Sequence, residues 1–180
     1  MPAENSEPTF EELKKAAEMG DVVALFAVAL RYETGDGIAA NIRFAAARYR
    51  KAAEAGHLGA QMALARMCLV GKGVVQDPEE AAQWYEKAAL QGDAVAQYNL
   101  AEMLFIGRGV DQNDEQAAHW YLKAALQGVV EAQLRIAKLL REGRGTEVNE
   151  TDSAKWYQTA VEHCLAQESE SDFESESDSE

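Results

Sequence analysis

Glycine recurs along this chain at a constant spacing of 36 residues. Three series share that spacing: Gly20, Gly56, Gly92 and Gly128; Gly35, Gly71, Gly107 and Gly143; and Gly37, Gly73, Gly109 and Gly145. Apolar residues keep the same step, as in Ala24, Ala60, Ala96 and Ala132, or in Tyr49, Tyr85, Tyr121 and Tyr157. Four units in phase, without an insertion, predict a repeat array in which each unit buries its apolar face against its neighbours.

Each unit is predicted to contain two helices. In the third unit Leu100 and Leu104 lie one helical turn apart, and Gly107 follows them, which is typical of a helix C-cap. The second helix should begin after an Asn or Asp that accepts hydrogen bonds from first-turn amides: Asn41, Asp77, Asn113 and Asn149. Glu80, three residues after Asp77, predicts a capping box there.

Large aromatic side chains recur on the predicted second helices. Trp84, Trp120 and Trp156 share one phase of the repeat, where the first unit has Arg48. Because small Ala residues recur opposite them, the tryptophans are predicted to fill the interfaces between units. Truncating a buried one to Ala should cost about 3–5 kcal/mol.

The predicted array runs from residue 10 to residue 166. Thr9 and Glu12 form another capping-box pattern, which predicts a short cap helix at 10–19. The repeats follow at about 21–56, 57–92, 93–128 and 129–165. Residues 167–180 alternate Ser with acids and include no basic residue, so we expect this tail to be disordered, as are residues 1–9.

Charge and composition limit the partners. The net charge is −14, and without the seven acids of the tail the body keeps 24 acids against 17 basic residues. Such a body repels phosphate backbones, so we expect no nucleic-acid binding. No secretory signal is visible, and the longest apolar stretch, 22–30, is too short for membrane insertion. Two cysteines without a recurring pattern favour a reducing, cytoplasmic setting. A monomer is the default expectation for the oligomeric state.

Three segments of the third unit carry a family resemblance. Residues 92–101 (GDAVAQYNLA), 107–110 (GRGV) and 117–125 (AAHWYLKAA) resemble Sel-one-like repeats, relatives of the tetratricopeptide repeat. The resemblance covers about residues 16–165. It implies an all-α fold, a right-handed α-α superhelix or solenoid, whose first helices line a concave groove. It also implies an adaptor that binds other proteins or peptides. A cysteine-rich branch of the family, described as binding penicillins, has paired cysteines in each unit that this chain lacks.

The sequence predicts no catalytic, cofactor or metal site. His57, His119 and His163 do not share a phase, and Cys68 lies at an apolar position of a first helix. The adjacent His163 and Cys164 point to different sides of one helix, whereas a metal site needs converging ligands. The Gly-x-Gly turns lack the strand and the Lys-Ser/Thr of a phosphate loop.

The first helices leave one face outside the recurring apolar stripe. Its positions are Val23, Ala27, Leu30 and Thr34; Gly59, Ala63, Arg66 and Val70; Val95, Asn99, Glu102 and Ile106; and Glu131, Arg135, Lys138 and Glu142. We call these sixteen positions the first-helix face. They vary between units, so they predict a binding surface for an extended segment or helix, with the candidate contacts Arg66, Asn99, Glu102, Arg135 and Lys138. The alternative is an ordinary solvated face.

The function predicted is therefore a non-enzymatic adaptor. A small-molecule or cell-wall-fragment binding protein, or a hydrolase related to the cysteine-rich branch, is the alternative. In the tail each of four serines has an acid three residues on, the context that acidophilic kinases favour: Ser169, Ser171, Ser175 and Ser177. A solubilising tail, or one that folds back onto basic residues of the first-helix face, are the other interpretations.

Overall fold

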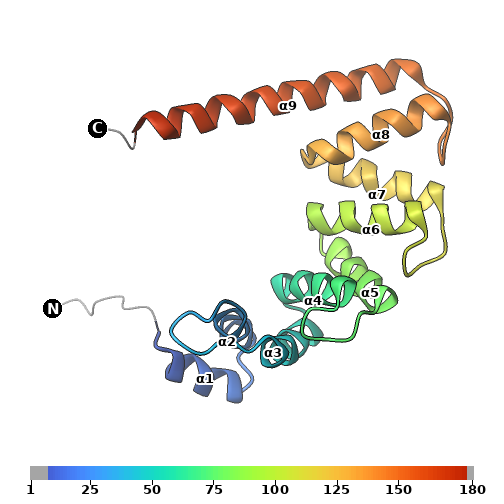
Figure 1. The fold of residues 1–180 in the computed structure, drawn as a ribbon. Coiled ribbons are helices and arrows are strands. Elements are labelled where there is room, and N and C mark those ends of the chain that lie inside the picture. The colour runs from blue at the N-terminus through green and yellow to red at the C-terminus, as the bar shows by residue number, and fades with distance from the viewer. Residues whose placement is uncertain (1–7, 178–180) are drawn as a thin grey trace. The chain divides into compact units, whose positions relative to one another are not determined.

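The computed structural model describes the backbone of residues 8–177 and the side chains up to residue 166, and this part of the chain contains helices and no strand. It divides into two compact units, with the boundary between residues 91 and 92. The first holds α1 (Phe10–Glu18), α2 (Val22–Thr34), α3 (Ile42–Glu54), α4 (Leu58–Val70) and α5 (Pro78–Leu90). The second holds α6 (Ala94–Ile106), α7 (Asp114–Leu126), α8 (Val130–Glu142) and α9 (Glu150–Ser177) (Figure 1). The predicted all-α repeat architecture is confirmed.

Helix boundaries follow the predicted caps. The first helix of every repeat ends at a left-handed glycine: Gly35, Gly71, Gly107 and Gly143, with φ of 65–78°. At the start of α5, Asp77 Oδ1 accepts the Glu80 N–H at 2.9 Å. The predicted capping box at Asp77 is wrong in its second half, because the Glu80 carboxylate binds Arg50 of α3 and Cys68 of α4 instead. The Asp77 N–H donates to the Cys68 carbonyl at 2.9 Å, and this backbone bond replaces the missing one.

In the second and fourth repeats the second glycine of the Gly-x-Gly turn brings consecutive repeats together. A Cβ on Gly73 would lie 2.7 Å from the carbonyl oxygen of Ile42, the first residue of α3. A Cβ on Gly145 would lie 2.1 Å from the carbonyl oxygen of Asp114, which opens α7 and occupies the same repeat position as Ile42. Both glycines also have positive φ, which L-residues rarely adopt. The turn therefore rests directly on the backbone of the preceding repeat.

Alanine and tyrosine form most of the core. Tyr49 and Tyr121 are the largest fully buried side chains, and buried alanines surround them on the second helices. The three tryptophans differ: Trp84 is buried, whereas Trp120 and Trp156 are half-buried. Lys87 Nζ lies 3.9 Å above the Trp84 ring and Lys123 Nζ lies 4.4 Å above that of Trp120. The three indoles are thus not buried to the same extent, and Trp84 alone of the three is buried as predicted.

A buried glutamine recurs in the first helices and links the repeats. Gln61, Gln97 and Gln133 share one phase, and each is less than 5 % exposed. Within the first unit Gln61 Nε2 donates to the Ala53 carbonyl of the preceding repeat at 3.2 Å, and Gln91 Nε2 donates to Gln61 Oε1 at 2.7 Å. Gln133 repeats the bond to the Ala125 carbonyl at 3.1 Å. One side chain therefore hydrogen-bonds both its own repeat and the one before it.

The N-terminal end follows the expectation, whereas the C-terminal end does not. At the N-terminus Thr9 and Glu12 form the predicted capping box; residues 1–7 of the predicted disordered segment lie outside the described residues. At the other end α9 continues to Ser177, although disorder was expected from 167. Extending a helix that is already formed avoids the cost of nucleation, and Glu is a good helix former, which accounts for the difference. Residues 178–180 lie outside the described residues.

Candidate functional site

In the first unit the first-helix face is largely apolar and open to solvent. Val23 and Leu30 of α2 are 68 % and 45 % exposed, and Val70 of α4 is 60 % exposed. Burying such side chains against a partner would be favourable by about 25 cal/mol per Å². Arg66 is exposed at the same face. This arrangement suits a ligand with both an apolar and an acidic part.

Three positions of the face are not open to solvent in the first unit, and Ala27 is one of them, being half-buried. Ala63 is only 5 % exposed, so it belongs to the core rather than to the predicted surface. Gly59 is half-buried, because the Phe26 ring of α2 lies against it, 3.2 Å from where a Cβ would stand. The Phe26 ring also stacks on His57, with centroids 4.4 Å apart. The exposed apolar surface is therefore carried by Val23, Leu30 and Val70.

A polar network crosses the face in the second unit. Arg135 of α8 binds Glu102 of α6 through two contacts, Nε–Oε1 at 2.8 Å and Nη2–Oε2 at 3.2 Å. The Tyr121 hydroxyl donates to Glu102 Oε1 at 2.6 Å. Burial and this carboxylate raise the pKa of Tyr121 above its ordinary value. The structure thus brings two predicted site residues together, but as partners of one another.

The other predicted contacts are also placed. Asn99 Nδ2 donates to the Val95 carbonyl one turn earlier, at 2.8 Å. Lys138 Nζ lies 3.9 Å from Glu142, an exposed pair of the kind that contributes little stability. The phosphorylation candidates Ser169, Ser171, Ser175 and Ser177 lie beyond the last described side chain.

The first unit has a related network that sequence reasoning missed. The Tyr49 hydroxyl donates to Glu33 at 2.9 Å, and Lys72 Nζ lies 3.1 Å from the same carboxylate. Tyr49 shares its phase with Tyr121, yet Glu33 lies about one helical turn away from the phase of Glu102. The sequence shows an acid on the first helix of the same repeat as each of these tyrosines, but it does not show that the acid's side chain points toward the tyrosine hydroxyl.

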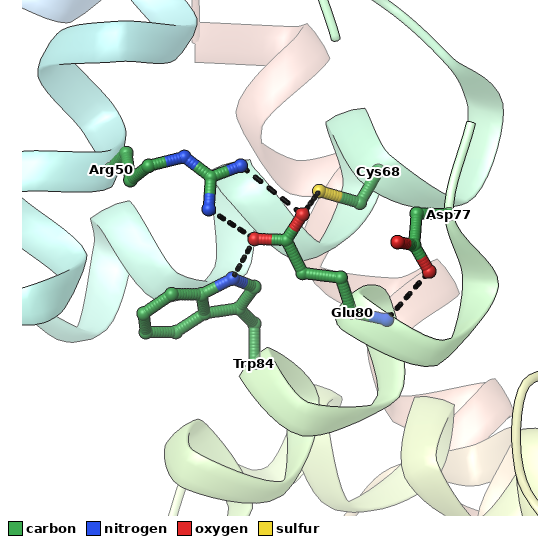
Figure 2. A network of polar contacts seen from close by, with 5 residues as sticks. All are labelled: Arg50, Cys68, Asp77, Glu80 and Trp84. Carbon is green, nitrogen blue, oxygen red and sulfur yellow. Dashed lines mark hydrogen bonds and ion pairs between the residues drawn. The ribbon is translucent and has the colours of Figure 1, made fainter. Parts of the chain in front are cut away.

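A second cluster surrounds the Glu80 carboxylate (Figure 2). Arg50 of α3 binds both of its oxygens, with Nη2–Oε2 at 3.1 Å, and Trp84 Nε1 donates to Oε1 at 3.1 Å. The Arg50 guanidinium is the main cause that lowers the pKa of Glu80 to about 2. The Cys68 thiol donates to Oε2 at 3.5 Å, and burial followed by the Glu80 charge raises its pKa to about 11. A neutral thiol beside so weak a base is unsuited to nucleophilic catalysis.

The described residues contain no group of three or more His, Cys, Asp or Glu that could hold a metal ion. Cys68 and Cys164 are both free thiols. Of the helices described here, none is long and apolar enough to cross a membrane.

Comparison with known proteins agrees with this architecture. Four segments match the family described as Sel1 repeat, at residues 22–57, 59–93, 94–129 and 130–163. The chain belongs to the Sel1 repeat family. Its fold is accordingly an all-α helical-repeat solenoid, as predicted. No relative was found among curated proteins.

Several solved structures are similar over most of this chain. A protective antigen present in uropathogenic Escherichia coli strains, with an SLR fold, is 33 % identical with a TM-score of 0.80, over 87 % of this chain and 33 % of its own. A Sel1 repeat protein from Oxalobacter formigenes is 33 % identical with a TM-score of 0.80, over 86 % of this chain and 63 % of its own. Helicobacter pylori cysteine rich protein B is 27 % identical with a TM-score of 0.54, over 69 % of this chain and 95 % of its own. The chain thus spans about a third of the first of these proteins and under two thirds of the second.

Proposed function

We propose that this Sel1 repeat chain is a non-enzymatic scaffold that binds a peptide or helix of a partner protein along its first-helix face. The observation that carries the proposal is the exposed apolar surface of Val23, Leu30 and Val70. Sel1 repeat proteins generally mediate protein–protein interactions. Apolar side chains that gather on one face, beside a charged residue such as Arg66, are typical of interaction sites.

The charged side chains divide between two roles in this proposal. The Glu102–Arg135 pair holds α6 and α8 together and presents a fixed polar surface, since each charge already has its partner. Arg66 and Lys138 are more exposed and are the cations that meet carboxylates of the bound segment. The two free thiols suit a reducing compartment, and we place the scaffold in the cytoplasm on that ground.

Point variants of the apolar surface test the proposal. Partners captured from a lysate with the tagged chain would be identified by mass spectrometry, and their affinity for purified variants measured by calorimetry. Leu30→Asp and Val70→Asp should each weaken a true ligand about 5–30-fold, because about 1–2 kcal/mol of apolar burial is lost.

Val75 provides the matched control. It is an exposed apolar residue in the turn between α4 and α5, outside the first-helix face. Val75→Asp should therefore leave the affinity unchanged. Equal affinities for the wild type, Leu30→Asp and Val70→Asp would rule out the first-helix face as the binding surface, as would an equal loss in Val75→Asp.

A further inference from the structure

A hollow of about 390 Å³ lies in the second unit, between α7, α8, α9 and the turn that precedes α9. Leu122, Leu140 and Trp156 supply apolar walls. The carboxyl-bearing side chains of Glu115 and Asp152 also line it. The hollow is formed mainly by second helices, so it does not belong to the first-helix face.

The first unit shows what fills the corresponding place. Two repeats earlier, at a distance of 72 residues, the positions of Leu122, Leu140, Asp152 and Trp156 are held by Arg50, Cys68, Glu80 and Trp84. These are the residues of the Glu80 cluster, where the Arg50 guanidinium lies against the carboxylate and the Trp84 N–H donates to it (Figure 2). The first unit therefore contains its own arginine at this repeat position.

In the second unit the acid and the tryptophan remain but the arginine is gone. Leu122 takes the place of Arg50, and Glu115 takes the place of a second cation, Arg43. At these three positions the second unit thus has two carboxylates and no arginine, where the first unit has one carboxylate and two arginines. Of the two acids, Glu115 is the more exposed.

The Asp152 carboxylate is fixed in place. Asn149 Nδ2 donates to one of its oxygens at 2.7 Å, and Lys155 Nζ lies 2.7 Å from the other. Lys155 is largely exposed, and an exposed ion pair of this kind contributes little stability. A carboxylate with two oxygens keeps acceptor capacity for a further donor.

The face of Trp156 differs from those of the other two indoles. Lysines three residues later on the same helix, Lys87 and Lys123, lie over Trp84 and Trp120. The residue at that position after Trp156 is Thr159, whose hydroxyl donates to the Lys155 carbonyl. The helix of Trp156 thus supplies no cation at that position, although an indole face attracts one.

We propose that this hollow binds an arginine side chain of a partner protein, with the guanidinium against Asp152 and Glu115 and its plane on the Trp156 ring. The incoming group would bind the acid as Arg50 does in the first unit, and would cover the indole as Lys87 and Lys123 do on the other two helices. Arginine suits the site better than lysine, because a planar guanidinium can bind a carboxylate through two parallel bonds and stack on an indole at once. The site is independent of the first-helix face, so either proposal can fail without the other.

The test uses N-acetyl-arginine amide as the probe and the indole N–H resonances of the full chain as the readout. The Trp156 resonance, assigned with Trp156→Phe, should shift saturably with a Kd of about 1–10 mM. The Trp84 resonance should not move, because Arg50 already occupies its site. N-acetyl-citrulline amide, which has the same shape without the charge, should bind at least tenfold more weakly.

Three variants test the geometry. Leu122→Arg supplies an internal arginine at the position of Arg50 and should abolish probe binding while leaving the chain folded. Glu115→Gln should weaken the probe several-fold, whereas Glu79→Gln, at the same position one repeat earlier, should not. Equal binding of arginine and citrulline probes, an unmoved Trp156 resonance, or full binding by Leu122→Arg would each overturn the proposal. If Leu122→Arg fails to fold, Asp152→Asn provides the test instead: it should weaken the affinity for the probe at least fivefold, and an unchanged affinity would overturn the proposal.

Discussion

Replacing Gly145 by alanine should destabilise the fourth repeat strongly. The new Cβ would lie 2.1 Å from the carbonyl oxygen and 2.3 Å from the carbonyl carbon of Asp114, so two repeat backbones would have to move apart. Such overpacking costs about 1–3 kcal/mol. The φ of +69° adds about 1–2 kcal/mol for a residue with a Cβ. The sum, about 2–5 kcal/mol, is a large part of the stability of a small domain.

Gly37→Ala separates the two contributions. Gly37 has nearly the same φ, +72°, but the nearest atom to its Cβ would be the flexible end of the Arg31 side chain at 3.7 Å. This variant should therefore lose only the conformational part, about 1–2 kcal/mol. The difference between the two variants measures the clash between consecutive repeats.

The two variants should be compared by urea unfolding and by hydrogen exchange. In a repeat array local unfolding is favoured, so Gly145→Ala should raise amide exchange most in α8 and α9. Equal losses of unfolding free energy in Gly37→Ala and Gly145→Ala would refute the reasoning, because the backbone contact with Asp114 would then carry no energy. A loss confined to α1 and α2 in Gly145→Ala would do the same.

Three further outcomes follow from the polar contacts. The pKa of Glu80 is lowered from 4.5 to about 2 by Arg50, so its contribution to stability is complete above pH 4.5 and is lost as the pH falls toward 2. In urea titrations Glu80→Gln should remove about 1–2 kcal/mol of that pH dependence, a value reduced for the partial exposure of the pair. Gln133→Leu deletes a buried hydrogen bond between repeats and should cost about 1–3 kcal/mol in thermal unfolding. Tyr121→Phe removes the bond to Glu102 but keeps the packing, and should cost about 1 kcal/mol in the same assay.

Helix boundaries could be predicted from the sequence because the signals that set them are local. The Asn41 side chain accepts the amide of Phe44, three residues away, and Gly35 closes α2 through a bond to Arg31 four residues earlier. Both depend only on residue types within one turn of helix. The constant period then copies each boundary into the next unit. That is why the repeat architecture could be predicted from the spacing of glycines and apolar residues.

The polar clusters could not be predicted in the same way. Arg50 and Glu80 are 30 residues apart, and Arg135 and Glu102 are 33 residues apart. Partners in neighbouring repeats meet only when the stacking geometry is known, and a repeat period does not fix side-chain direction. The predicted capping box at Asp77 failed for this reason, because Glu80 had a cation available from another repeat.

The stacking of these repeats depends on glycines and glutamines that recur at fixed repeat positions. Other positions can therefore differ in chemistry from repeat to repeat within the same fold. Gly73 and Gly145 set the distance between backbones, while buried glutamines join first helices to the preceding repeat. The repeat position of Arg50 takes part in neither the glycine contacts nor the glutamine hydrogen bonds. Leu122 can therefore stand at this position in the second unit without disturbing the packing of the repeats. Where the arginine is absent, a hollow remains between the helices, because the backbone contacts keep the helices at the same spacing. A group supplied by another protein can then complete it.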